Sequence, residues 1–175
     1  MTAPRVIDLA SLSAATRDDF VAALEGIFEH TPWIAERAYA ARPFASVDAL
    51  HRAMVAAVAA AAPEAKLALI RAHPELAGKE AAAGTLTVDS RGEQSSAGLD
   101  RCTAGELARL RDGNRAYREK FGFPFVMAVK HCGKREILDA LQARLAGTHD
   151  AEFERCIAEI ESIARFRLVA LLGEA

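Results

Sequence analysis

An arginine interrupts the apolar stripe near the end of the chain. From Phe153 onward, apolar residues recur every three or four positions, which predicts one buried face of a helix over about residues 150–172. Arg167 falls within this stripe, whereas Arg165 is expected to point toward solvent. A buried guanidinium is costly without an anion, so Arg167 must meet a carboxylate supplied by the protein or by a ligand. The stripe consists of Phe153, Cys156, Ile157, Ile160, Ile163, Ala164, Leu168 and Leu171.

The composition favours helices that pack closely together. Half of the 175 residues are apolar and only 6% are aromatic, and alanine is abundant. The length suits one well-packed domain and is short for two. We therefore predict an all-α fold, in which residues 1–175 form a single-domain compact bundle of about seven to nine helices.

Helical patterns recur along most of the chain. Pro74 ends one of these helices near His73, because proline pushes the preceding residue out of helical geometry. Residues 75–89 form the main irregular segment, with a β-like patch at Thr85–Val88. The predicted helices cover about residues 18–28, 32–38, 47–58, 63–73, 103–120, 134–146 and 150–172, and another helical pattern begins near Ser90.

Charge and cysteine content exclude several classes of protein. The formal net charge is -2 and no face concentrates Lys or Arg, so nucleic acid and membrane are not expected partners. Three widely spaced cysteines without a CxxC pair fit a reducing compartment and argue against disulfides or a thiolate zinc site. The sequence contains no HExxH, GxSxG or phosphate-loop motif, so we expect no metal or nucleotide. With no export or peroxisomal signal, the expected location is the cytoplasm.

His73 is the first candidate for chemistry, because it ends a predicted helix and precedes an irregular loop. Imidazole is the side chain best suited to move protons near neutral pH, and a histidine at such a position can face a cleft. The alternative is a partly buried histidine that hydrogen-bonds a backbone carbonyl. A single histidine without identified partners favours that alternative.

Two polar segments have both a structural and a functional interpretation. Ser90 and Glu93 have the spacing of a capping box, whereas Glu93 and Gln94 beside a helix start also suit a ureido or amide ligand. For Arg167 the alternatives are an internal ion pair, with Glu93 or another acid, and a ligand carboxylate. The apolar run 121–129 is a strand or a bent buried helix of the core. Its glycine and proline interrupt the backbone, whose polar groups need partners that a flat polar ligand could supply.

Five segments resemble the 2-oxo-4-hydroxy-4-carboxy-5-ureidoimidazoline (OHCU) decarboxylases of purine (urate) catabolism. The segments occur in the order found in that family and cover most of the chain. They are FVAALEGIFEHTPWIAERA from Phe20, RAHPELAG from Arg71, LTVDSRGEQSSAGLD from Leu86, NRAYREKFGFPFVMAVK from Asn114 and IARFRL from Ile163.

The resemblance implies an all-helical, dimeric, cofactor-free enzyme that converts OHCU to (S)-allantoin and carbon dioxide. Its expected partners are this small ureidoimidazoline and a second copy of the chain. The catalytic residues that it implies are His73, Glu93 and Arg167, with Arg167 binding the carboxylate. The substrate-binding residues that it implies are Pro74, Ser90, Arg91, Gly92, Glu93, Gln94, Phe125, Val126, Met127, Ala128 and Val129.

The mechanism expected from these residues is general acid–base chemistry. His73 acts on the hydroxyl next to the departing carboxylate and donates a proton, and Glu93 orients His73 or the ureido group. The chain departs from the family pattern at His131 and Glu25, where relatives usually have glycine. The rival interpretations are a non-catalytic helical interaction module and a related lyase that acts on another ureido acid. A cleft lined jointly by His73, Glu93 and Arg167 would favour the enzyme.

Overall fold

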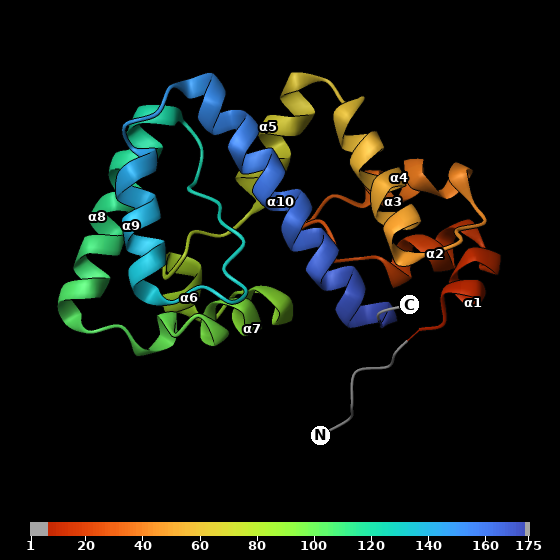
Figure 1. The fold of residues 1–175 in the computed structure, drawn as a ribbon, viewed down its shortest axis with the longest axis horizontal. Helices are drawn as coiled ribbons and strands as arrows, with labels where there is room; N and C mark the ends of the chain where they lie inside the picture. The colour runs from red at the N-terminus through yellow and green to blue at the C-terminus, as the bar shows by residue number, and fades with distance from the viewer. Residues whose placement is uncertain (1–6, 174–175) are drawn as a thin grey trace. The chain divides into compact units, whose positions relative to one another are not determined.

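The computed structural model describes residues 7–173, which contain ten α-helices, two 3₁₀ helices and no β-strand (Figure 1). The predicted all-α class is therefore confirmed. The helices outnumber the predicted seven to nine because α1 and α6, with six and five residues, are too short to show an apolar period. The first α-helices are α1 (Leu9–Ala14), α2 (Arg17–Ala23), α3 (Pro32–Ala38), α4 (Val47–Ala59), α5 (Pro63–Ala72) and α6 (Lys79–Ala83). The others are α7 (Val88–Ser96), α8 (Ala104–Phe121), α9 (Lys134–Arg144) and α10 (His149–Leu172), and the 3₁₀ helices are η1 (Tyr39–Ala41) and η2 (Leu99–Arg101).

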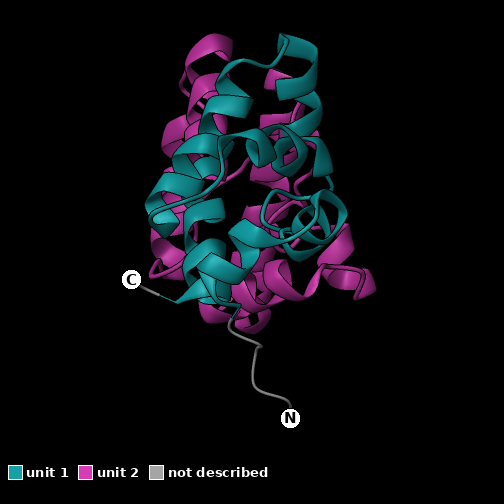
Figure 2. Ribbon diagram, turned by 90° about the vertical axis from the view of Figure 1, so that its right-hand side faces the viewer, with its two compact units in different colours: residues 1–69, 161–175 teal, residues 70–160 magenta. Residues whose placement is uncertain are grey.

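The chain divides into two compact units (Figure 2). Unit 1 comprises residues 1–69 and 161–175, and unit 2 comprises residues 70–160, so the divisions fall within α5 and α10. Each unit has its own apolar core. Phe20, Ile34 and Leu50 are fully buried in unit 1, and Tyr117, Phe123 and Leu141 are fully buried in unit 2. The expectation of a single domain over residues 1–175 stays a prediction.

Helix α10 has the buried face that its apolar spacing predicts. Cys156, Ile160, Ala164 and Leu168 are buried, and so is Arg167. Arg165 is exposed, as expected, and forms an ion pair with Asp48 at 2.9 Å. In the described range, neither α10 nor any other single helix is long and apolar enough to cross a membrane, although the bent pair α4 and α5 passes the same length and composition test.

Side-chain caps fix the start of several helices. Thr16 and Ser46 accept hydrogen bonds from the backbone N–H groups of Asp19 and Ala49, and so begin α2 and α4. Helix α8 begins with a capping box, in which Thr103 and Glu106 each accept a hydrogen bond from the other's backbone N–H. These caps explain why the predicted starts of α4 and α8 agree with the structure.

Helix α2 is shorter than its apolar pattern indicates. The pattern predicts a helix to Phe28, but α2 ends at Ala23, and Gly26 has a left-handed φ of 89°. Ile27 and Phe28 are nevertheless buried. The predicted end of this helix was wrong, because apolar residues in a turn can be buried in the core as helical residues are. The resulting non-helical segment 24–30 is where Arg167 finds its partners.

Helix α7 begins earlier than predicted. Thr87 is its N-cap and accepts a hydrogen bond from the backbone N–H of Ser90 at 3.3 Å. The predicted capping box of Ser90 and Glu93 is therefore wrong, because Ser90 already lies within the helix. The β-like patch at Thr85–Val88 is wrong for the same reason, since Thr87 caps a helix and does not extend a strand.

Candidate functional site

His73 lies directly after the last residue of α5, as Pro74 requires. Its backbone N–H donates to the carbonyl of Ile70 at 3.2 Å, which closes the helix end. The residue is only 6% exposed. The imidazole is therefore held inside unit 2, at the start of the loop 74–78 that leads to α6.

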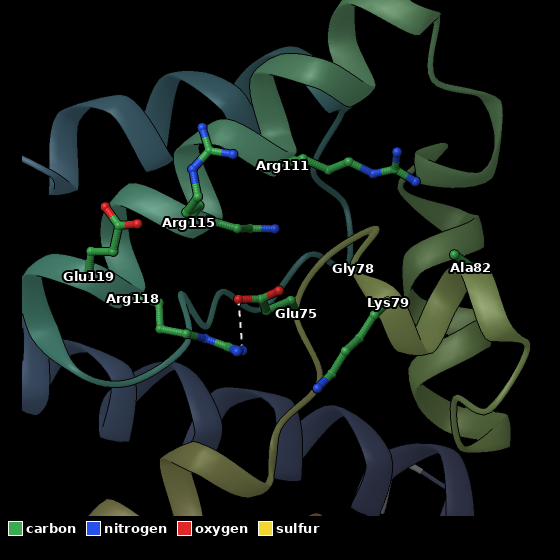
Figure 3. Close-up of a pocket in the computed structure, with 9 residues that line it drawn as sticks. Glu75, Gly78, Lys79, Ala82, Arg111, Arg115, Arg118 and Glu119 are labelled. Atoms are coloured by element: carbon green, nitrogen blue, oxygen red, sulfur yellow. Dashed lines mark ion pairs between the residues drawn. The ribbon is translucent and has the colours of Figure 1, made fainter.

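Polar side chains from α7 and α8 hold this loop. The Oε1 atom of Gln94 accepts a hydrogen bond from the backbone N–H of Ala77 at 2.9 Å, and its Nε2 atom donates to Glu75 O at 3.5 Å. Asn114 Nδ2 donates to the backbone carbonyl of Leu76 at 2.9 Å. Arg118 forms an ion pair with the Glu75 carboxylate at 2.8 Å (Figure 3). Three successive residues after His73 and Pro74 are thus tied to two helices.

The same loop contains one residue whose conformation costs free energy. Ala77 has a φ of 49°, in the left-handed region that side chains other than glycine rarely adopt. At Gly78 an added Cβ would lie 2.7 Å from Glu75 Cβ, so the loop leaves no room for a side chain there. The strained backbone of Ala77 persists only where the surrounding structure imposes it.

Helix α7 presents only part of the segment Ser90–Gln94 to the interior. Ser90 and Gln94 are buried and Glu93 is partly buried, whereas Arg91 and Gly92 are exposed. The guanidinium of Arg91 donates to Gly84 O at 2.9 Å. The predicted free N–H groups are absent here, because those of Ser90 and Arg91 already bond to Thr87. The segment Ser90–Gln94 can therefore offer side chains, whereas the start of the helix lies before it, at Val88.

The apolar run 121–129 leaves α8 as irregular backbone, neither strand nor helix. Arg144 donates to Val126 O at 2.7 Å, and the carboxylate of Glu159 accepts from Ala128 N at 2.9 Å. Interrupted backbone was expected to need polar partners, and side chains of the protein supply these two. By contrast, the N–H and C=O groups of Met127 make no hydrogen bond with any described residue. Backbone bonds made at alternate residues are typical of an extended segment with one side still open.

A buried polar network supports the Val126 contact. The Arg144 Nε atom lies 2.7 Å from the carboxylate of Glu152, which also accepts a hydrogen bond from the Tyr117 hydroxyl. A second guanidinium nitrogen of Arg144 lies 3.3 Å from the sulfur of Cys156. Burial, and next the hydrogen bond to Glu152, raise the pKa of Tyr117, and burial raises the pKa of Cys156. The raised pKa values favour the neutral hydroxyl and thiol, beside the ion pair of Arg144 and Glu152.

Arg167 forms an internal ion pair in unit 1. Its Nη1 atom lies 2.7 Å from both Glu29 Oε2 and Gly26 O. The two side chains are 5% and 2% exposed. An internal pair was one of the two alternatives for this arginine, and the partner is Glu29 and not Glu93. The role of Arg167 toward a ligand, and a cleft shared with His73 and Glu93, stay predictions.

No cluster of three or more His, Cys, Asp or Glu residues suited to a metal ion occurs among residues 7–173. The candidate groups of unit 2 are thus an imidazole, a carboxylate and open backbone groups. In unit 1 the candidate is a guanidinium whose orientation is fixed by an acid. These groups can transfer protons and bind carboxylate or amide functions.

Comparison with known families shows which family the chain belongs to. The family model for OHCU decarboxylase matches residues 13–169. The chain belongs to the OHCU decarboxylase family. The match spans His73, the α7 segment, the irregular run after α8 and Arg167, so no candidate residue lies outside it.

Relatives in the OHCU decarboxylase family come from distant organisms. The chain is 41% identical over 162 residues to the 2-oxo-4-hydroxy-4-carboxy-5-ureidoimidazoline decarboxylase of Haloferax volcanii, covering 93% of this chain and 94% of that protein. It is 42% identical over 167 residues to the uric acid degradation bifunctional protein PucL of Bacillus subtilis. That alignment covers 95% of this chain and 32% of the relative, so the chain spans about a third of the bifunctional protein.

Solved structures share the fold of this family member. A crystal structure of (S)-allantoin synthase matches with a TM-score of 0.75 and 28% identity, covering 95% of this chain and 54% of that one. A crystal structure of OHCU decarboxylase in the presence of (S)-allantoin matches with a TM-score of 0.66 and 22% identity, covering 81% and 92% of the two chains. At 22% identity, the match to the second structure shows a shared fold only.

Several residues that shape this decarboxylase-family site were missed by sequence analysis. Asn114 occupies the buried face of α8, between Leu110 and Tyr117, just as Arg167 occupies that of α10. A polar residue within an apolar stripe is therefore the signal that could have found it. Glu29 and Arg144 gave no comparable signal, because their burial depends on partners far away in the sequence.

Proposed function

We propose that this protein catalyses the decarboxylation of OHCU to (S)-allantoin, as a carbon–carbon lyase of urate degradation. The observation that carries the proposal is the family match over residues 13–169, together with a relative of nearly equal length named for this reaction. Loss of carbon dioxide leaves an electron pair on a ring carbon, which then takes up a proton. The conjugated imidazoline can delocalise that pair, so the proposal requires no separate electron sink.

His73 is the proposed general acid–base of the reaction. Its imidazole acts on the hydroxyl next to the departing carboxylate and then delivers a proton to the ring carbon. The fixed helix end and the tied loop support this role, because an imidazole held in one direction can protonate one face and give a single enantiomer. Glu93 from α7 is proposed to orient His73 or to bind the ureido group.

The substrate's ureido and amide groups are proposed to bind open backbone of the irregular run. Met127 offers one N–H and one C=O that no described residue uses, which matches the paired donor and acceptor of an amide. Arg144 and Glu159 hold the backbone on either side of it in place. The other proposed contacts come from Pro74, Ser90, Arg91, Gly92, Phe125, Val126, Ala128 and Val129.

Arg167 is the proposed ligand for the substrate carboxylate. A guanidinium has five N–H donors, and the bonds of Nη1 to Glu29 and Gly26 orient the group as a whole. The Arg167→Lys protein keeps a cation for Glu29 but loses the planar fork. We expect KM for OHCU to rise roughly tenfold, with a smaller change in kcat.

Arg165→Lys is the matched control for this measurement, because Arg165 is exposed and pairs with Asp48 on the surface. Its kinetic constants should equal those of the wild type. An Arg167→Lys protein that is fully folded and has an unchanged KM would contradict the carboxylate role.

The central experiment adds the purified protein to freshly generated OHCU and follows optical activity. We expect optical rotation to appear as one allantoin enantiomer accumulates, because the proton is delivered from one face. Allantoin should also form faster than in the uncatalysed reaction. Racemic product at the uncatalysed rate would contradict the proposal. Turnover of a different ureido acid without turnover of OHCU would support the related lyase instead.

The assembly and location expected from the resemblance are part of the same proposal. We propose a homodimer located in the cytoplasm. Sedimentation velocity on the purified protein tests the first of these, and microscopy of the tagged protein in its own host tests the second.

A further inference from the structure

Two unfavourable features lie in and beside the loop 74–78. Ala77 adopts a left-handed φ of 49°. Asn114, which is 2% exposed, has an Oδ1 atom that is buried and has no hydrogen-bond partner among the described residues. A buried polar atom without a partner and a left-handed alanine each destabilise a fold. Their concentration beside one loop indicates that the conformation of this loop matters for more than stability.

Gln94 and Asn114 impose this conformation. Both side chains are buried, and both use their amide groups on the loop's backbone. Gln94 Oε1 accepts from Ala77 N at 2.9 Å, and Asn114 Nδ2 donates to Leu76 O at 2.9 Å. These two bonds hold both polar groups of one peptide, the one that joins Leu76 to Ala77, with Gln94 acting from α7 and Asn114 from α8. The strained residue, Ala77, contributes its N–H to the peptide group that these two side chains hold.

We propose that Gln94 and Asn114 are positioning residues that hold Leu76 and Ala77, and thereby fix the direction of the His73 imidazole. This inference rests on the proposed catalytic role of His73. It also gives Gln94 a different role from the substrate contact that the family resemblance implies. Only Pro74 and Glu75 separate His73 from Leu76, where the held peptide group begins, and the ring of Pro74 restricts rotation between them. A shift at Ala77 is therefore transmitted to His73.

The first test compares Gln94→Met and Asn114→Leu with the wild type. Both substitutions keep approximate side-chain size and remove the hydrogen bond to the loop. We expect kcat for OHCU to fall about 10- to 100-fold, because small misplacements of a catalytic group have effects of this size. KM should change by less than roughly threefold, since a positioning residue does not touch the substrate.

The decisive test is rescue of Gln94→Met by a second change, Ala77→Gly. Glycine adopts a positive φ without the hydrogen bond that forces alanine into it. If Gln94 acts through Ala77, the double variant should regain at least about half of the lost activity on a logarithmic scale. If Gln94 instead binds the substrate, glycine at position 77 restores nothing, and the proposal is wrong.

A second readout follows the ring signals of His73 by NMR without substrate, assigned by comparison with the His73→Asn protein. We expect these signals to shift in Gln94→Met and to return toward their wild-type positions in the double variant. This measurement separates two failures. A wild-type protein that is inactive on OHCU would refute the proposed function. His73 ring signals that stay at their wild-type positions in both Gln94→Met and the double variant would refute the positioning role.

Arg111→Gln and Glu119→Gln are the matched controls. Both residues lie on α8 and line the same 550 Å³ pocket as Asn114 and Glu75, and neither forms an ion pair with a described residue (Figure 3). Their kcat and His73 signals should equal those of the wild type. Should Asn114→Leu fail to fold, Asn114→Asp removes the same donor with the same shape. A folded Gln94→Met protein with wild-type kcat and unmoved His73 signals would overturn the inference.

Discussion

The His73→Asn protein is expected to fold normally and to lose about 10²- to 10⁴-fold of its kcat on OHCU. Asparagine is polar and of similar reach, so it can occupy the buried position at the end of α5, where His73 is 6% exposed. It cannot exchange a proton near neutral pH, which is the role proposed for the imidazole. Initial rates measured by the appearance of optically active allantoin, corrected for the uncatalysed reaction, check this expectation.

His149→Asn is the control for the loss of a histidine as such. His149 begins α10, is exposed, and has no part in the proposed chemistry. Its variant should turn over OHCU at the wild-type rate. A folded His73→Asn protein with near-normal turnover would show that another group donates the proton. Far-ultraviolet circular dichroism and an unfolding curve establish that both variants are folded.

The helices could be predicted from sequence wherever a long apolar period met a clear start signal. The starts predicted for α4, α8 and α10 lie within about two residues of those observed. The errors occur where local signals compete. Thr87 and Ser90 are both good caps, and only the packing of Ser90 and Gln94 against the interior decides between them. The end of α2 was misjudged because Ile27 and Phe28 are buried from a turn.

The burial of Arg167 was predictable from the sequence, but the contacts of the candidate residues were not. The apolar stripe showed that Arg167 is buried, but its partner Glu29 lies 138 positions away in the chain. Gln94 belongs to a polar segment suited to a ligand, yet its amide binds the loop after His73. The spacing of apolar residues predicts whether a side chain is buried. Its hydrogen-bond and ion-pair partners depend on how distant segments of the chain fold together.

One departure from the family pattern has a backbone explanation. His131 stands where the resemblance leads us to expect glycine, and it adopts a left-handed φ of 70°. Glycine enters this region freely, whereas a residue with a Cβ is strained there by about 1–2 kcal/mol. Glycine at this position would therefore relieve backbone strain. Glu25, the other departure, is exposed in the turn after α2.

The Arg144→Met protein is expected to lose about 3–5 kcal/mol of its free energy of unfolding, the usual cost of removing one partner of a buried ion pair. Arg144 and Glu152 are 10% and 8% exposed and lie 2.7 Å apart. Methionine fills much of the same space but leaves the Glu152 carboxylate buried without its cation. It also leaves Val126 O without its donor. Urea denaturation with an unchanged m-value measures the loss.

Arg115→Met is the matched control, because Arg115 pairs with Asp112 at the same kind of distance, 2.8 Å, but on the surface, where both side chains are 67% exposed. Solvent screens that pair, so its loss should cost less than about 1 kcal/mol. If both variants lost the same free energy of unfolding, burial of the Arg144–Glu152 pair would not explain the effect. Adding Glu152→Gln to Arg144→Met should recover part of the stability, since it removes the uncompensated charge.

The same variant distinguishes stability from site geometry. At a temperature where Arg144→Met remains folded, the backbone of the irregular run is released at Val126 but still held at Ala128 by Glu159. If Met127 binds the amide groups of the substrate, as proposed, KM should rise in this folded protein while His73 still transfers its proton. An unchanged KM would mean that Arg144 serves the core of unit 2 alone, and that the open backbone groups are ordered without it.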